Sequence, residues 1–326
     1  MNNRFQAVWI DHALSGFHHC YFGVPQGRNL GPLFFLIFYN DLPLSVNCSV
    51  DAYADDSTMT VSASTVEDIG AQLTENCKIV NDWMLGNKLK LNAEKTHLLT
   101  IGTGARLKNQ ASKVVVEMDG IELKESQSET LLGCWVEPNL KWHKQVNTLL
   151  TKLQTRLAAL QRLKNIISVN SRKTIAEGIF TSVLSYCLPV FGGCDKGEIE
   201  ALQILQNKAA RIITSSGIRT DRHQLISGVG WMTVRQLIYY HTALTTFRIR
   251  MWKEPEYLND IMNRNNRSNK IVVPNSTLSL AMKSYCFRGA NDWNKLPEDI
   301  RNYTKIGDFK RQLKAWILKN VPQFYD

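Results

Sequence analysis

The spacing of apolar residues changes near the middle of the chain and predicts two kinds of architecture. Before residue 139, short strand-like runs surround two predicted helices. The first begins at Gly31-Pro32, where proline suits the first helical turn, and its residues are apolar nearly all round, so we expect a buried helix. The second repeats apolar residues at intervals of three and four: Val66, Ile69, Leu73, Cys77, Val80 and Met84.

Several segments of this first part have the composition of strands. Ser49–Tyr53 and Ser57–Ser62 flank Ala54-Asp55-Asp56 and predict a strand–turn–strand hairpin. Val114–Leu123 predicts another hairpin, because Asp119-Gly120 is a favoured two-residue turn. Further strands are predicted at Leu89–Leu91, His97–Ile101 and Leu131–Val136.

From Trp142 onward, helical spacing dominates. Helices are predicted at 143–167, 171–187, 197–214, 231–253 and 308–319. The polar stretch Asn263–Lys270 predicts a loop or linker. The sequence therefore predicts an α+β fold, with an α+β part at 1–138 and helical regions at 139–215 and 216–326.

The net charge of +10 is unevenly distributed along the chain. Residues 1–138 carry 10 Lys+Arg against 16 Asp+Glu, a balance of −6, whereas residues 139–326 carry 29 against 13, a balance of +16. A strongly basic half favours a polyanionic partner, most simply nucleic acid. The alternative is a solvated surface that happens to be basic.

Other features argue against membrane, secreted and zinc-binding classes. The longest purely apolar run, Leu33–Tyr39, has seven residues, too few to cross a bilayer. The first residues lack the apolar core of a signal peptide, and the seven cysteines show no CxxC pair. We therefore expect an intracellular protein, nuclear or cytoplasmic, with reduced thiols. His18, His19 and Cys20 are adjacent residues that point in different directions, which disfavours a zinc site.

Tyr53-Ala54-Asp55-Asp56 is the most informative short segment. Adjacent aspartates are poor strand formers, and clustered carboxylates repel one another unless a cation relieves the repulsion. Magnesium binds one or two protein carboxylates together with substrate phosphates, and two such ions can hold the attacking and leaving oxygens of nucleotidyl transfer. The alternative is a polar hairpin turn, where aspartate is also favoured.

The neighbouring segments favour the metal interpretation. Gly23-Val24-Pro25-Gln26-Gly27 and the run from Leu30-Gly31-Pro32 to Asn40-Asp41-Leu42-Pro43 precede the aspartates. Together these blocks resemble a motif pair of non-LTR, LINE-type reverse transcriptases. Three later sets of residues also resemble the family. The family's next motif is matched by Trp83 with Asn87-Lys88-Leu89 and Lys95-Thr96, and the segment leading into the thumb by Leu132-Gly133 with Leu140-Lys141-Trp142. The C-terminal tail of jockey-like elements is matched by Trp293-Asn294-Lys295-Leu296-Pro297 with Phe309.

This resemblance implies an incomplete polymerase palm at 1–138, a thumb-like region at 139–215 and a C-terminal region at 216–326. It implies that Asp55 is the principal ligand of two Mg²⁺ ions, with Asp56 supporting it. The residues implied to bind nucleotide and template are Gly23, Pro25, Gln26, Gly27 and Tyr53. Lys95 would reach the triphosphate, the alternative being a surface lysine beside a strand.

The implied activity is RNA-directed DNA polymerisation. The implied partners are an RNA template, a DNA primer and deoxynucleoside triphosphates; no membrane association is expected, and no protein partner is indicated.

The sequence also departs from the family pattern. The family has a further catalytic aspartate in a motif like F-x-D-x-x-x-A-F-D before GVPQG, and no such motif occurs in the 22 residues before Gly23. Asp11 is a possible stand-in, although Trp9-Ile10…Leu14-Ser15 better matches a segment between the two motifs. We therefore expect a fragment that polymerises poorly alone. A non-catalytic nucleic-acid-binding remnant and an unrelated metal-dependent protein are the alternatives.

Overall fold

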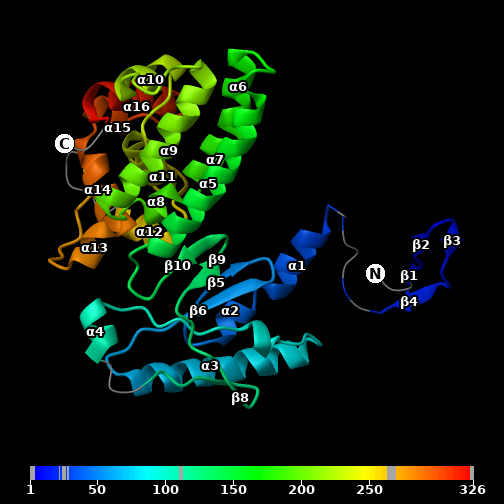
Figure 1. Cartoon of the computed structure of the whole chain (residues 1–326). Helices are drawn as coiled ribbons and strands as arrows, with labels where there is room; N and C mark the ends of the chain where they lie inside the picture. The colour runs from blue at the N-terminus through cyan, green and yellow to red at the C-terminus, as the bar shows by residue number, and fades with distance from the viewer. Residues whose placement is uncertain are drawn as a thin grey trace. The chain divides into compact units, whose positions relative to one another are not determined.

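A computed structural model describes residues 4–21, 23, 27, 29–109, 113–262 and 269–323. The chain divides into two units (Figure 1). Unit 1 comprises Met1–Thr100 and Lys108–Ser126, and unit 2 comprises Ile101–Leu107 and Gln127–Asp326. Both helices and strands are present, which confirms the α+β class.

The first part of unit 1 is a pair of nested hairpins. Its strands are β1 (Arg4–Gln6), β2 (Trp9–Ile10), β3 (Ala13–Leu14) and β4 (His18–Cys20). Strand β1 pairs antiparallel with β4, and β2 with β3. Asp11 and His12 turn the inner hairpin with φ of 46° and 67°, the positive values that a type I′ turn requires. Asp11 thus has a structural role as a turn residue.

The remaining elements of unit 1 surround one long helix. They are α1 (Gly31–Tyr39), α2 (Leu42–Ser45), β5 (Ser49–Tyr53), β6 (Asp56–Thr60), α3 (Val66–Gly86), η1 (Ala93–Lys95), β7 (Glu117–Met118) and β8 (Ile121–Glu122). The Thr65 side chain accepts a hydrogen bond from the Asp68 amide at 3.1 Å and fixes the predicted start of α3. Cys77 and Val80 of α3 belong to two separate small hydrophobic clusters.

The prediction that the apolar helix α1 is buried is wrong for this chain. Leu33, Leu36 and Ile37 are 50%, 58% and 66% exposed. Only one side of the helix is covered: Tyr39 is buried, with its ring 5.9 Å from that of Trp83 on α3. A helix that is apolar on every side would be stabilised by burial on every side, but its burial depends on which other elements pack against it.

The strand predictions had mixed outcomes. The hairpin at Asp119-Gly120 is confirmed, with both residues at positive φ. Residues 89–91 and 97–101, all described, form no named strand; Leu98 makes one isolated parallel bridge with Glu125. The predicted strand at 131–136 is instead a hairpin, because Leu132 and Gly133 take φ of 46° and 78° and reverse the chain.

Unit 2 is mainly helical. Its elements are β9 (Glu129–Leu131), β10 (Cys134–Val136), α5 (His143–Leu163), α6 (Val169–Ala176), the π-helix η2 (Glu177–Thr181), α7 (Ser182–Ser185), α8 (Leu188–Phe191), α9 (Lys196–Thr214), α10 (Arg222–Val229), α11 (Val234–Trp252), α12 (Glu256–Met262), α13 (Ser279–Lys283), α14 (Tyr285–Lys295), α15 (Glu298–Arg301) and α16 (Ile306–Asn320). Helix α4 (Gly104–Asn109) lies where the chain passes between the two units.

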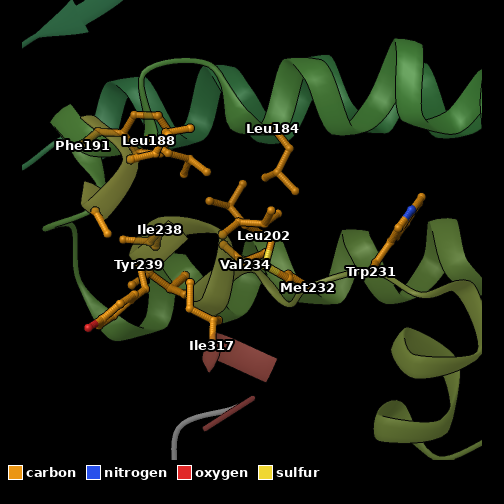
Figure 2. Packing of buried hydrophobic residues seen from close by; sticks show 14 of the residues in the cluster. Leu184, Leu188, Phe191, Leu202, Trp231, Met232, Val234, Ile238, Tyr239 and Ile317 are labelled. Atoms are coloured by element: carbon orange, nitrogen blue, oxygen red, sulfur yellow. The ribbon is translucent and has the colours of Figure 1, made fainter. Parts of the chain in front are cut away.

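One hydrophobic core holds unit 2 together. Helix α9 packs against α5 and α10, while α11 packs against α8, α14 and α16. The helix predicted at 143–167 forms as α5, and its apolar residues at helical spacing face the core: Val146, Leu149, Leu153, Leu157 and Leu160 are buried, and Leu150 is half-buried. Figure 2 shows the same core further along, where Leu202 of α9 and Val234 of α11 lie among side chains of other helices.

The tryptophan-containing tail segment contributes to this core. Trp293 is 1% exposed, and its ring lies 6.0 Å from that of Phe309, which stacks on Phe247 at 4.1 Å. The Asn294 side chain makes two 2.8 Å hydrogen bonds to the backbone of Ile271, in the segment before α13. The residues that resemble the tail of jockey-like elements therefore have a packing role here.

The subdivision of the helical half at residue 215 stays a prediction, and buried side chains from both sides of that position share the core of unit 2. Among the helices that the structure describes, none is both long and apolar enough to cross a membrane.

Candidate functional site

The two aspartates lie at the tip of the β5–β6 hairpin. Tyr53 pairs with Asp56 across the strands, so Ala54 and Asp55 form the two-residue turn. Ala54 has a φ of 54°, a left-handed conformation that costs a residue with a Cβ roughly 1–2 kcal/mol. Such local strain is typical of functional turns, and here it presents Asp55 beside Asp56.

The hairpin has one face toward protein and one toward solvent. Because side chains alternate along a strand, Val50 and Met59 share a face, and both pack against a cluster that includes Tyr39. The Tyr39 hydroxyl is hydrogen-bonded to that of Ser57 on the same face. Asp51, Tyr53 and Asp56 therefore project on the opposite side.

Tyr53, Asp55 and Asp56 are exposed in this chain. Among the described residues, the two aspartates belong to no group of three potential metal ligands. The hairpin thus supplies two solvated carboxylates, a hard-oxygen set of the kind that binds Mg²⁺ together with phosphate oxygens.

Asp51 was not singled out in the sequence. The alternation of strand β5 is the signal that would have placed it on the same face as Asp56.

The glycines before α1 are explained by backbone conformation. Gly23 and Gly27 have φ of 77° and 79°, values that favour glycine, and a Cβ at either would meet nothing within 4 Å. Arg4 donates a 2.5 Å hydrogen bond to the carbonyl of Gly23. Pro25 and Gln26, the other members of the predicted nucleotide and template set, lie outside the described residues.

Lys95 ends the short 3₁₀ helix η1 and is exposed. Its amide donates to the carbonyl oxygen of Asn92 at 3.1 Å and to Oδ1 of the same residue at 3.3 Å, so the backbone is fixed while the side chain extends into solvent. The strand expected beside it does not form.

Helix α5 is the clearest basic element of unit 2. Its 21 residues contain no Asp or Glu. Its Lys and Arg residues are all exposed: Lys144, Lys152, Arg156 and Arg162. Lys152 and Arg156 are one turn apart, on the side of the helix away from its buried leucines. Exposed cations on a helix that carries no acidic residue of its own suit a phosphate backbone.

Comparison with known proteins identifies the family. The family described as reverse transcriptase (RNA-dependent DNA polymerase) matches residues 3–159. A probable RNA-directed DNA polymerase from transposon BS of Drosophila melanogaster is 24% identical over 240 residues, covering 70% of this chain. The RNA-directed DNA polymerase from mobile element jockey of the same organism is 24% identical over 205 residues, covering 60%. The family match and these relatives support a non-LTR, LINE-type reverse transcriptase.

A third relative, the probable polymerase from transposon X-element, is 24% identical over 222 residues. This chain spans about a quarter of the length of these relatives, namely 26%, 22% and 24%. No solved structure matches it.

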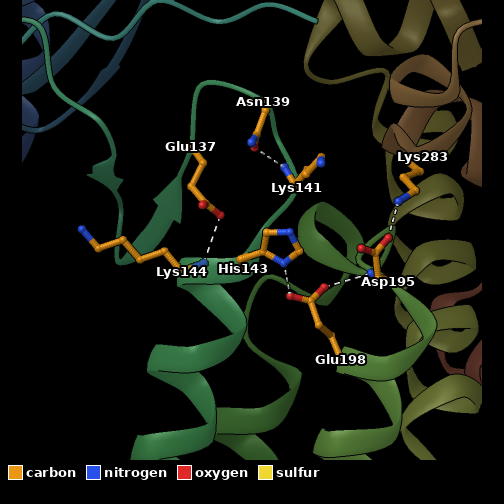
Figure 3. A network of polar contacts seen from close by, with 8 residues as sticks. All are labelled: Glu137, Asn139, Lys141, His143, Lys144, Asp195, Glu198 and Lys283. Atoms are coloured by element: carbon orange, nitrogen blue, oxygen red, sulfur yellow. Dashed lines mark hydrogen bonds and ion pairs between the residues drawn. The ribbon is translucent and has the colours of Figure 1, made fainter. Parts of the chain in front are cut away.

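A polar network of unit 2 was not predicted from the sequence (Figure 3). His143, Asp195 and Glu198 could each offer a metal a ligand atom, and these atoms lie within 4.8 Å of one another. All three are already engaged. His143 Nδ1 lies 2.6 Å from Oε1 of Glu198, and Oε2 of Glu198 accepts a hydrogen bond from the Asp195 amide at 2.9 Å.

The remaining carboxylate of the network, Asp195, lies 2.5 Å from the ammonium of Lys283, which holds the pKa of that carboxyl below its ordinary value. The contacts of Asp195 and Glu198 are those of a capping box at the start of α9. Asp-x-x-Glu spacing indicates such a cap, but the joining of His143 and Lys283 to it depends on tertiary structure.

Proposed function

We propose that this reverse transcriptase chain takes part in RNA-directed DNA synthesis through the exposed aspartates of the β5–β6 hairpin. The single observation that carries the proposal is the position of Asp55 and Asp56 at a strained, solvent-facing turn whose opposite face is anchored on Tyr39. The family match and the polymerase activity for which its relatives are named support the reaction class.

The donor set fits divalent magnesium. Two exposed carboxylates provide hard oxygen ligands and leave the remaining coordination positions to water and phosphate. Bound there, two Mg²⁺ ions would stabilise the attacking and leaving oxygens of an in-line displacement at the nucleotide phosphate. Asp55 would be the principal ligand of these ions, and Asp56 would support it.

We extend the proposal to the other residues whose roles the family resemblance implies. Gly23, Pro25, Gln26, Gly27 and Tyr53 bind the incoming nucleotide and template, and the flexible ammonium of Lys95 reaches the triphosphate. The helices after Trp142 act as a thumb that grips the RNA template and DNA primer. Four exposed cations and no acidic residue on α5 support that role.

The isolated 326-residue polypeptide is expected to polymerise poorly. It contains no F-x-D-x-x-x-A-F-D motif, and no third ligand residue joins Asp55 and Asp56 within the described part of the chain. With one carboxylate fewer, charge stabilisation at the reacting phosphate falls. Robust magnesium-dependent extension of a DNA primer on RNA by this polypeptide would refute the expectation.

The site is tested most directly by nucleotide binding. Replacing both ligands, Asp55→Ala with Asp56→Ala, is expected to weaken Mn²⁺-dependent binding of a deoxynucleoside triphosphate by at least about tenfold, or about 1.4 kcal/mol. Titration calorimetry measures this. A matched control, Glu117→Ala with Glu122→Ala, removes two exposed carboxylates from the β7–β8 hairpin of unit 1 and should bind as wild type. Equal loss in both variants would reject the site.

A second candidate function is nucleic-acid binding without catalysis. The basic surface of α5 favours it, because phosphate contacts do not depend on the aspartates. Primer–template binding that persists in the Asp55→Ala, Asp56→Ala variant, together with no Mn²⁺-dependent nucleotide binding in either protein, would support this alternative.

A further inference from the structure

The solvent-facing side of the β5–β6 hairpin carries a third aspartate, Asp51. In the register of the two strands, Asp51 pairs with Thr58, and Tyr53 pairs with Asp56. Because side chains alternate along each strand, these four side chains share one face, and Asp51 is the diagonal neighbour of Asp56. The Cβ atoms of such diagonal neighbours are roughly 7 Å apart.

Packing on the opposite face fixes this arrangement. Val50 and Met59 pack against the cluster that includes Tyr39, and the Tyr39 hydroxyl is hydrogen-bonded to that of Ser57. A register shift of one residue would move Val50 to the solvent face and Asp51 to the packed face. The hairpin therefore holds Asp51 on the side where Asp56 projects.

The hairpin has three negative charges and no positive one. Residues 49–60 include Asp51, Asp55 and Asp56 but no Lys or Arg. All three aspartates are exposed, and none of them forms a salt bridge with any residue in the part of the chain that the structure describes. Neighbouring carboxylates repel one another, and a divalent cation bound among them relieves the repulsion.

Asp51 does not join Asp55 and Asp56 as a third direct ligand. Within the described ranges, the ligand atoms of these aspartates form no group of three that could share one ion. A carboxylate can still act on a cation through water, because Mg²⁺ usually keeps several of its waters when it binds protein carboxylates. Groups that hydrogen-bond to the ligands of a metal orient them and raise the affinity for the metal.

We propose that Asp51 is a positioning residue of the β5–β6 site, whose carboxylate acts through water on the divalent cation that Asp55 and Asp56 bind. This inference rests on the function proposed for the hairpin and adds a residue to it. The competing explanation is that a charged side chain on a short exposed strand prevents pairing with another chain. That explanation predicts no effect of Asp51 on cation binding.

The size of the effect follows from Coulomb's law. In water, a unit charge ~7 Å from a divalent ion raises the affinity for that ion roughly sevenfold. Salt screens this attraction, because the Debye length falls from ~30 Å at ~0.01 M ionic strength to ~8 Å at ~0.15 M. The contribution of Asp51 should therefore be measured at low salt.

The test follows Mn²⁺ binding to the full 326-residue protein without nucleotide. Paramagnetic broadening of the Ala54 and Asp56 amide resonances in nuclear magnetic resonance spectra reports the occupancy of this site separately from any other. At ~0.01 M salt, Asp51→Asn should raise the dissociation constant for Mn²⁺ roughly sevenfold, and Asp51→Glu, which keeps the charge, should restore it to within about twofold of wild type.

The matched control is Asp119→Asn, which removes the same charge from the tip of the β7–β8 hairpin. Asp119 has a φ of 53°, a conformation that asparagine tolerates. This control should change the dissociation constant by no more than about twofold, because the attraction falls with distance. An equal effect of Asp51→Asn and Asp119→Asn would overturn the inference.

A second variant separates this inference from the proposed function. Asp55→Ala with Asp56→Ala should abolish the broadening, and unchanged broadening would reject the cation site together with the role of Asp51. Lost broadening in that variant, with the same dissociation constant for Asp51→Asn and wild type, would overturn the role of Asp51 alone. If Asp51→Asn lowers both the affinity and the thermal midpoint, and Asp51→Glu restores neither, the role of Asp51 is structural and the inference fails.

Discussion

Removing two cations from α5 should weaken primer–template binding in a salt-dependent way. The substitutions are Lys152→Ala with Arg156→Ala, both exposed, one turn apart, and away from the buried face of the helix. Each phosphate contact adds about 0.9 to the slope of log affinity against log salt, so losing two should reduce that slope by about 1.8. If the variant and the wild type bind equally at about 1 M salt, the variant should lose affinity roughly 30-fold at about 0.15 M salt and roughly threefold at about 0.5 M salt.

Fluorescence anisotropy of a labelled RNA–DNA primer–template over this salt range measures the slope directly. The matched control is Lys310→Ala with Lys314→Ala, which removes the same charge at the same spacing from α16. It should leave the slope close to that of wild type. An equal slope change in both variants would mean that the whole basic half acts as a diffuse attractor. A loss independent of salt would mean that α5 contributes no phosphate contacts.

Three further predictions concern stability. Gly70→Ala should destabilise unit 1 by about 1–3 kcal/mol, because the new Cβ would lie 2.6 Å from the Val115 carbonyl oxygen. Gly86→Ala on the same helix would meet no atom within 4 Å and should stabilise the unit by about 0.5–1 kcal/mol. Urea unfolding measures both changes, and equal effects would contradict the steric argument. Phe309→Ala, at a fully buried position, should lower the unfolding free energy of unit 2 by about 3–5 kcal/mol in the same assay, and a loss below about 1 kcal/mol would show that its stacking is dispensable. Lys283 depresses the pKa of Asp195, so the ion pair stabilises the fold fully above the unfolded pKa of about 3.9, and this stability is lost as pH falls through the lower folded pKa. Asp195→Asn keeps a capping side chain and should flatten the pH dependence of the thermal midpoint below about pH 4. A pH profile identical to that of wild type would refute this.

The amphipathic helices were predicted well because their signal is local and repeated. The six-residue apolar row of α3 extends over about five turns and the row from Val146 to Leu160 in α5 over about four, so one exposed or misplaced residue does not change the period. The Asp119-Gly120 turn was equally clear, since both positions needed positive φ.

The short strands were predicted less well because two or three residues carry little pattern. Leu131–Val136 has the composition of one strand, yet it folds as two strands around Leu132 and Gly133. The glycine is a signal that was available, but the leucine before it takes a positive φ that its own side chain disfavours. Contact with Tyr186, 53 residues further along the chain than Gly133, accompanies that turn.

Residue order and composition were enough to predict the α+β class, the period of the long helices, the paired aspartates with the family they resemble, and the basic character of the second half. These properties depend on residues close together in the chain or on composition, so no tertiary contact is needed to state them. Tertiary contacts alone established that α1 is largely exposed and that the His143–Glu198 contact joins α5 to the capping box of α9. Each of these outcomes depends on which distant side chains cover or contact a residue. Because hydrophobic burial is non-directional, a local apolar pattern predicts that a residue will be buried but not which residues will cover it.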